Sequence, residues 1–174
     1  MRSLLRLIAI LVLSVVACMA LLVTVVEVTS TPPKQSKIVR DFAAHRAAYE
    51  QVRAMLLQDQ GVGTVADWGI ESPGSPIAHI PPEGGMTVAR YREYLALLKQ
   101  IGVTIVARRS EPLAVDFGVW GSGWGGDTRH VNVVWLEHEP PNTVESLDAF
   151  YRTPKPRTPS YVHIDGPWYL WADW

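Results

Sequence analysis

The sequence contains little cysteine and almost no net charge. Its 174 residues include one cysteine, Cys18, so the chain cannot form an internal disulfide, and everything after its first segment lacks a thiol nucleophile. The 16 Lys and Arg residues almost balance the 17 Asp and Glu residues, which gives a formal net charge of -1. Because nucleic-acid-binding proteins normally carry a basic surplus or stripe, we expect no nucleic-acid partner. The length leaves room for one domain.

Charge is also absent from a long run near the N-terminus. The twenty residues 7–26 carry no charged side chain, and only Ser14 and Thr24 are polar. At about 1.5 Å per residue, a helix of this length spans the roughly 30 Å of a hydrocarbon core. The run therefore predicts a single-pass transmembrane helix that contacts the lipid bilayer through residues 7–26.

Two alternatives to an uncleaved anchor stay open. Arg2 and Arg6 resemble the start of a cleaved secretory signal, although no good A-x-A cleavage site follows the run. Lipid attachment to Cys18 fits the order Val-Val-Ala-Cys, but apolar residues follow it where a polar tether is normal. The flank 27–33 has no positive charge, which favours an N-terminus inside the cytoplasm. We therefore expect a cytoplasmic-membrane protein with a periplasmic or extracellular C-terminal domain.

The two prolines at positions 32 and 33 separate this run from the rest of the chain. Proline lacks the N–H that a helix needs and disfavours helical backbone in the residue before it. We therefore predict a membrane anchor over residues 1–28, a linker over 29–35 and a single α+β domain over 36–174.

Two helices are predicted early in this domain. The first covers about residues 36–58 and has one apolar face, made by Ile38, Phe42, Tyr49, Val52 and Leu56. The second begins after Thr87 as N-cap and ends at Gly102, a residue suited to the left-handed C-terminal position. The Gly- and Pro-rich segment 67–85 between them is expected to be mostly loop, after a short strand near residues 63–67.

Strand patterns dominate after Gly102. The predicted strands are 103–108, 113–120, 131–138, 161–164 and 168–172, with a short helix around 144–151. Helices followed by strands are typical of α+β proteins. The expected fold is an N-terminal transmembrane helix followed by two main helices packed on an antiparallel sheet of about five strands.

Two segments carry a family resemblance. The helix end Leu97-Leu98-Lys99-Gln100-Ile101-Gly102-Val103 and the strand Trp168-Tyr169-Leu170 resemble a family of small uncharacterised bacterial proteins. In that family a helix ending in Leu-Leu-x-x-Ile/Leu-Gly-Val precedes a sheet that closes with Trp-Tyr-Leu. The resemblance covers about the last half of the chain and implies a bacterial source and an α+β fold. It implies no activity, so no residue receives a role from it.

The residues around the possible cofactor and metal motifs do not fit a cofactor or metal site. Residues 121–126 match G-x-G-x-x-G, but a strand pattern follows them where a dinucleotide site needs a helix. A flexible loop with Trp124 at its tip fits better, and we expect no cofactor. His130 and His138 lie eight residues apart, about 26 Å along a continuous strand, so they cannot share a metal ion. We expect no metal site.

Candidates for catalysis are few. His163 and Asp165 are two residues apart on one strand and could form a His–carboxylate pair for general-base work. An Asp before Gly166 is also common in turns for purely local reasons. No G-x-S-x-G motif is present. A glycosidase-like pair of Asp116 and Glu137 lacks any further sign of a cleft.

Tryptophan is unusually frequent, with seven residues, all after the linker. Trp side chains combine a large contact area with a polar N–H and recur at binding surfaces. We select Trp124, Trp171 and Trp174 as candidate binding residues. The best functional hypothesis is a membrane-anchored, non-catalytic binding protein of the bacterial envelope, with an envelope protein or a cell-wall ligand as partner. An inhibitor or immunity role would fit, and the alternative is an envelope hydrolase that uses the His–carboxylate pair.

Overall fold

A computed structural model describes residues 13–21, 31–124, 127–152 and 158–173. The chain forms two compact units, Met1–Pro32 and Pro33–Trp174. In the first unit residues 13–21 are helical and bear exposed apolar side chains at Leu13, Val15, Val16, Met19 and Leu21. Among the described residues, none of the helices is long and apolar enough to cross a membrane. The predicted transmembrane helix is thus corrected, and the rest of its run, 7–12 and 22–26, lies outside the described residues.

Two long helices form one layer of the second unit. Helix α2 covers Gln35–Gln58, and its buried residues include all five of the predicted apolar face. Helix α3 covers Val88–Ile101, with Thr87 accepting a hydrogen bond from the Arg90 backbone N–H and Gly102 at φ 73°. The predicted caps are confirmed. The two helices are joined at one end, because Asp59 accepts hydrogen bonds from both Arg90 and Tyr94, each at 2.9 Å.

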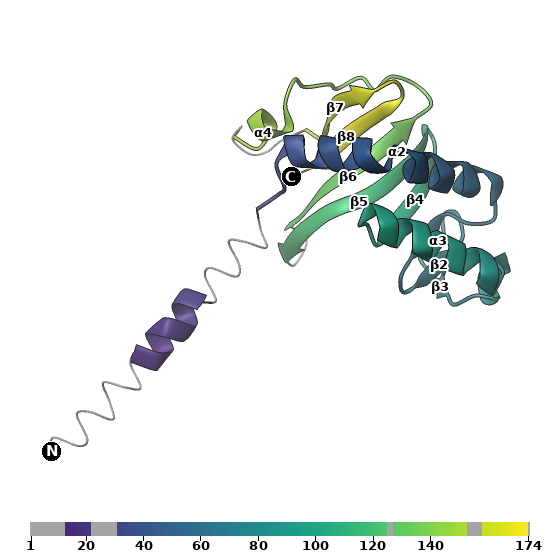
Figure 1. Cartoon of the computed structure of the whole chain (residues 1–174), viewed down its shortest axis with the longest axis horizontal. Helices are drawn as coiled ribbons and strands as arrows, with labels where there is room; N and C mark the ends of the chain where they lie inside the picture. The colour runs from purple at the N-terminus through teal and green to yellow at the C-terminus, as the bar shows by residue number, and fades with distance from the viewer. Residues whose placement is uncertain (1–12, 22–30, 125–126, 153–157, 174) are drawn as a thin grey trace, which may run out of the picture. The chain divides into compact units, whose positions relative to one another are not determined.

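The second layer is one antiparallel sheet in the order β3-β2-β1-β4-β5-β6-β8-β7 (Figure 1). Its strands are β1 Thr64–Ala66, β2 Gly69–Glu71, β3 Ala78–His79, β4 Ile105–Ser110, β5 Leu113–Trp124, β6 Asp127–Leu136, β7 Ser160–Asp165 and β8 Trp168–Asp173. The expectation of about five strands is therefore wrong, since the described sheet has eight. Strands β2 and β3 lie in the segment expected to be mostly loop. They contain only three and two residues, too few for a periodic pattern.

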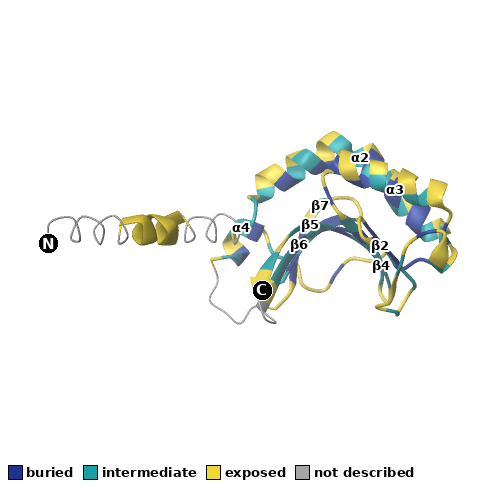
Figure 2. Ribbon diagram, turned by 90° about the horizontal axis from the view of Figure 1, so that it is seen from below, coloured by how far each residue is buried: buried dark blue, intermediate teal, exposed yellow. Residues whose placement is uncertain are grey.

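The main core lies between the helices and the sheet face that we call the inner face. Figure 2 shows α2 and α3 over this same face, with their buried sides turned toward the strands. Trp168 is fully buried at its centre, where its ring centroid lies 5.1 Å from Phe42 and 6.0 Å from Tyr49. The Trp168 indole N–H donates to Glu50 at 2.9 Å. A buried polar group is thereby satisfied, as such groups must be.

The sheet face turned away from the helices, here called the outer face, holds a second buried cluster. Strand residues alternate between faces, so Ala114 and Val134 point away from the main core that their neighbours fill. Both are nevertheless 0% exposed and pack with Leu136 and Tyr169. The partly buried Tyr161 and Trp171 pack against this cluster. Aromatic side chains of the sheet itself therefore cover part of the outer face.

A short helix and one loop complete the unit. Helix α4 covers Leu147–Phe150, within the predicted range 144–151, and its Leu147 and Phe150 join the main core. The Leu147 backbone N–H donates to Gln35 at the start of α2 at 2.7 Å. Before it, Val144 donates to the Tyr161 carbonyl and Tyr161 to the Asn142 carbonyl, both at 2.8 Å. These bonds protect part of β7, which is an edge strand of the sheet.

Candidate functional site

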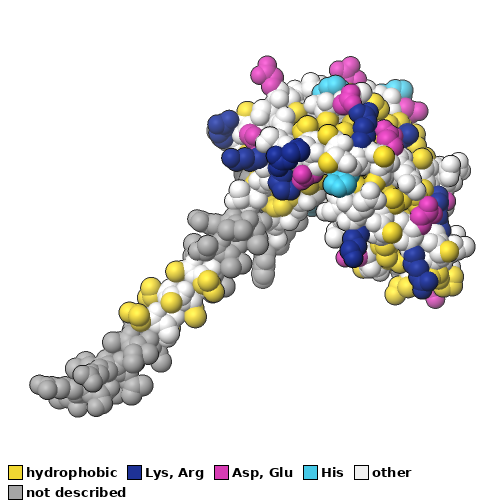
Figure 3. Space-filling view, in the orientation of Figure 1, with side chains coloured by type: hydrophobic (Ala, Val, Ile, Leu, Met, Phe, Trp, Pro, Cys, Tyr) yellow, Lys and Arg dark blue, Asp and Glu magenta, His cyan; other side chains and the backbone are white. Residues whose placement is uncertain are grey.

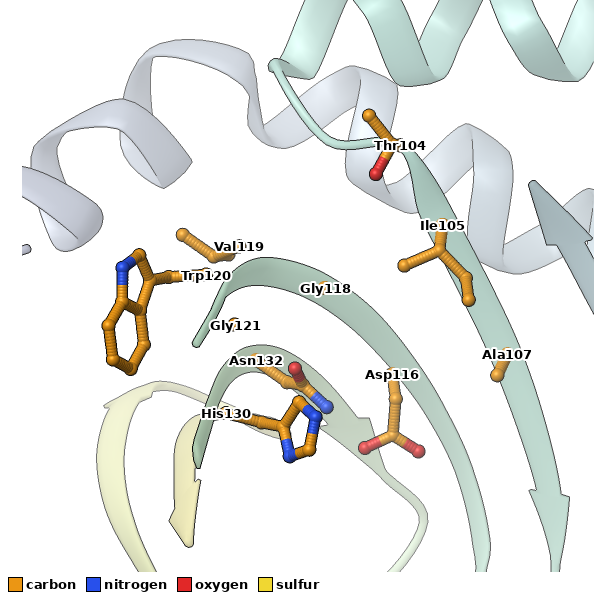
Figure 4. Close-up of a pocket in the computed structure, with 10 residues that line it drawn as sticks. All are labelled: Thr104, Ile105, Ala107, Asp116, Gly118, Val119, Trp120, Gly121, His130 and Asn132. Atoms are coloured by element: carbon orange, nitrogen blue, oxygen red, sulfur yellow. The ribbon is translucent and has the colours of Figure 1, made fainter. Parts of the chain in front are cut away.

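A groove of about 400 Å³ lies on the outer face, across β4, β5 and β6. Its polar lining residues are Asp116, His130 and Asn132, and Figure 4 shows their side chains pointing into the same hollow. Ile105 and Ala107 form one side, and Val119 and Trp120 lie at the other end. The volume is within the roughly 300–1,000 Å³ of small-molecule sites.

The hollow exists because small residues occupy the middle of these strands. Gly118 and Gly121 of β5 and Ala107 of β4 all line it. A Cβ atom on Gly118 would lie 2.6 Å from Ile105 Cγ2, so the close approach of the two strands' side chains requires glycine there. At Gly121 the nearest heavy atom, His130 Cδ2, would be 3.4 Å from such a Cβ, which is ordinary van der Waals contact. Small residues therefore open the hollow, although the Ile105 side chain lies over Gly118 and His130 lies beside Gly121.

Asp116 is held in place by a two-point ion pair. Arg109 Nε donates to Asp116 Oδ2 at 2.6 Å and Arg109 Nη2 donates to Oδ1 at 3.0 Å. The Asp116 side chain is only 12% exposed. Burial opposes the charge of Arg109, but its hydrogen bonds and charge interactions with Asp116, and further interactions with Tyr161, outweigh this and raise the pKa of Arg109. Arg109 therefore stays charged and neutralises the carboxylate.

His130 is paired with a second carboxylate. Asp173 of β8 accepts from the His130 backbone N–H at 2.6 Å, and its Oδ2 lies 3.2 Å from His130 Nδ1. A carboxylate on one ring nitrogen fixes the orientation of the ring and leaves the other nitrogen for a ligand or a proton. The His130 side chain is 45% exposed, so solvent reaches this site.

Asn132 differs from its two polar neighbours because its amide is uncommitted. It lies opposite Gly118 on β5 and opposite Trp171 on β8, so all three share the outer face. Within the described part of the chain, its side chain makes no hydrogen bond, whereas Asp116 and His130 are both engaged. A planar amide offers two donors and one acceptor. Asn132 is therefore the group most available to a ligand.

The predicted catalytic pair has a different environment. His163 Nε2 contacts the Gly166 carbonyl oxygen at 3.0 Å, and its ring packs against Tyr169 with 5.2 Å between centroids. Asp165 instead forms an ion pair with Arg46 of α2. Both residues are exposed, and His163 lines an open depression beside Glu139 and Glu145. The two side chains thus engage separate partners, and their catalytic role stays a prediction.

The predicted tryptophans are only partly described. Trp171 is half-buried on the outer face, next to Asn132 and packed against the second cluster. Trp124 ends β5, and its side chain lies outside the described residues, as does all of Trp174. The binding role of these three residues also stays a prediction.

Asp116 and His130 were considered separately in the sequence, which did not predict that they meet Asn132 in one groove. The alternation in β5 placed Asp116 and Gly118 on the face opposite Phe117, and this was the available signal. Which residues of β6 and β8 lie beside them depends on strand register, which one sequence does not reveal. Among the described residues, no group of three or more His, Cys, Asp or Glu side chains is arranged to hold a metal ion.

The surface charges show no concentration of one sign on the side that carries the helices. Figure 3 shows acidic and basic side chains interspersed there. Several are paired, including Lys37 with Asp41 at 2.6 Å and Arg53 with Glu50 at 2.9 Å. The outer-face groove, with its uncommitted Asn132 amide, therefore remains the most specific candidate site. No protein-family model, curated protein or solved structure matches this chain.

Proposed function

We propose that this chain is a non-catalytic binding protein of the bacterial envelope, and that its ligand occupies the outer-face groove. The observation that carries the proposal is a preformed hollow that small residues open and that oriented polar side chains line. Few convergent polar groups within a mostly apolar lining are typical of ligand sites. Asp116 and His130 are already held by Arg109 and Asp173, so the site needs little rearrangement to bind.

Binding is favoured over catalysis by the composition of the lining. Its ten residues include no Ser, Cys, Lys or Tyr, and Thr104 supplies the single hydroxyl. The Asp116 carboxylate is engaged by two hydrogen bonds from Arg109. These residues can orient a ligand but provide no activated nucleophile.

A fragment screen by ¹⁵N NMR tests this proposal. The full chain is used in a detergent without a sugar headgroup, and fragments that shift the amide signals of Gly121, His130 and Asn132 are scored. We expect these shifts to disappear in Ala107→Trp, which fills the groove, and to persist in Ala78→Trp, which adds the same side chain at an exposed position on β3. Fragments that bind only elsewhere, or equally well to both variants, would contradict the proposal.

The envelope location rests on the uncharged run over residues 7–26. Apolar side chains of its described part are exposed, and such side chains are candidates to contact a bilayer. Fusing alkaline phosphatase after Pro33 tests the location of the second unit. High phosphatase activity is expected, whereas an inactive fusion would place this unit in the cytoplasm and refute the envelope assignment.

Hydrolysis is the second candidate function, and one observation favours it. His130 and Asp173 form a His–carboxylate pair at 3.2 Å, the arrangement that the sequence suggested for His163 and Asp165. Such a pair can hold a ring for general-base catalysis. Its test is turnover of nitrophenyl esters, glycosides and phosphates by the full chain and by His130→Asn, which keeps a hydrogen-bonding group near Asp173. Turnover that is lost in the variant while the thermal melt is unchanged would favour hydrolysis over binding alone.

A further inference from the structure

We infer that the ligand of the outer-face groove is an uncharged, hydroxyl-rich molecule, specifically a neutral saccharide. The inference rests on the proposed binding function and names the chemistry of its ligand. It is built from three properties of the groove: the charge of its lining, its available hydrogen-bonding groups, and its apolar residues.

The charge balance disfavours an anionic ligand. None of the ten lining residues is Lys or Arg. The guanidinium of Arg109 is committed to Asp116 through two hydrogen bonds. A phosphate or carboxylate would therefore meet the Asp116 carboxylate in a lining that contains no Lys or Arg to offset its charge.

The same balance disfavours a strongly cationic ligand. Asp116 is already neutralised by Arg109, and Asp173 is engaged by the backbone and ring of His130. Each carboxylate therefore already has a hydrogen-bonding partner, and neither is a bare charge that would attract a cation strongly. The groove therefore presents polar atoms of nearly balanced charge, which suits a neutral ligand.

The available groups are those that hydroxyls need. The Asn132 amide can donate and accept, and with Nδ1–H of His130 donating to Asp173 the neutral ring offers Nε2 as an acceptor. Each oxygen of Asp116 has a further lone pair beyond the bond from Arg109. A hydroxyl both donates and accepts, so a ring bearing several hydroxyls can satisfy all three side chains together.

The apolar lining matches the other side of such a ring. Ile105 lines the groove, and Trp171 lies beside Asn132 on the same face. Val119 and Trp120 lie at one end of the groove, where they also pack against the main core. Saccharide rings have C–H faces that pack on aromatic and aliphatic surfaces while their hydroxyls point outward. Trp provides a large contact area for such packing.

Part of the groove floor has one unpaired side. Strand β5 pairs with β4 only as far as Phe117, whereas its pairing with β6 continues through Gly118 and Gly121. Peptides commonly bind sheets by adding a strand where backbone groups are unpaired. An extended peptide is therefore the alternative occupant, and the experiment includes a peptide probe to test it.

The experiment measures binding of defined probes to the full chain by NMR of the tryptophan indole N–H signals. The neutral saccharide probes are N-acetylglucosamine trimer and maltotriose, the anionic probe is inorganic phosphate, and the peptide probe is trialanine. We expect at least one saccharide to shift the Trp120 or Trp171 signal, each assigned by its Phe variant. Phosphate and trialanine should leave both signals unchanged.

Three variants locate the binding. Ala107→Trp should abolish saccharide binding, and Ala78→Trp should leave it unchanged. Asn132→Leu keeps the side-chain size but removes its hydrogen-bonding groups, so it should raise the Kd for the saccharide by about 3- to 10-fold. An unchanged thermal melt of Asn132→Leu would separate lost recognition from lost folding.

The outcomes distinguish the ligand class from the binding function. Groove-dependent binding of phosphate or trialanine without saccharide binding would overturn the saccharide inference and leave the proposed function standing. Saccharide binding that survives Ala107→Trp would overturn the assignment to this groove. If neither the four probes nor the fragment screen shows groove-dependent binding, both the inference and the proposed function are overturned.

Discussion

The buried cluster on the outer face leads to a prediction about Val134. Val133 and Val134 are neighbours on β6 and point to opposite faces, yet each is 0% exposed. Val133 belongs to the main core beneath the helices, and Val134 belongs to the second cluster with Ala114, Leu136 and Tyr169. In antiparallel sheets covered on one side, the uncovered face normally meets water. The structure instead requires that both valines stabilise the fold to a similar degree.

The magnitude follows from the buried methyl groups. Replacing valine by alanine removes two methyl groups, worth about 0.8 kcal/mol each in transfer free energy, and adds a cavity cost. We expect Val134→Ala to lower the free energy of unfolding by about 1.5–2.5 kcal/mol, within about 0.5 kcal/mol of Val133→Ala. A substitution at an ordinary exposed strand position changes stability by about 0.5 kcal/mol or less.

Urea unfolding followed by tryptophan fluorescence provides the assay. The matched control is Thr128→Ala, which removes another β-branched side chain from an exposed position on the same strand. The midpoint should fall for both valine variants at an unchanged m-value, since m reports the surface exposed on unfolding. If Val134→Ala matches Thr128→Ala rather than Val133→Ala, the second cluster does not contribute to stability and our account of the outer face is refuted.

Two further predictions concern the helical layer. Burial, with a smaller effect of Asp41, raises the pKa of Tyr49 to about 12 from 10.0. The protonated Tyr49 phenol contributes its full share of the free energy of unfolding below pH 10, and this share is lost as pH rises toward 12. The loss is about 1.4 kcal/mol by pH 11 and about 2.7 kcal/mol in all. Tyr49→Phe should therefore lose less stability than the wild type between pH 9 and 11 in urea unfolding, and an equal loss would contradict the assignment. Gly102→Ala places a Cβ on a residue with φ 73° and should lower the free energy of unfolding by about 1 kcal/mol. We expect Tm to fall by about 2–4 °C in thermal unfolding. An unchanged Tm would show that alanine is not strained at this cap.

The two long helices could be predicted from the sequence because their signals are local. The apolar positions of α2 recur every three, four or seven residues. Thr87 and Gly102 mark the two ends of α3, and each lies directly next to the helix. The core faces of the longer strands could also be predicted, since alternation in β5 separates Phe117 from Asp116 and Gly118. Each of these patterns depends on neighbours within a few positions.

Strands β2 and β3 needed the tertiary structure, because pairing with β1 and with each other defines them. The same holds for the groove. His130 meets Asp173 across 43 residues of sequence, and Asn132 lies opposite Gly118 through the register of β5 and β6. Register and strand order arise from the packing of the whole sheet against the helices, so a side chain's neighbours across strands do not follow from its own sequence surroundings. The residue types of the groove were therefore visible in the sequence, while their meeting at one place was decided by the fold.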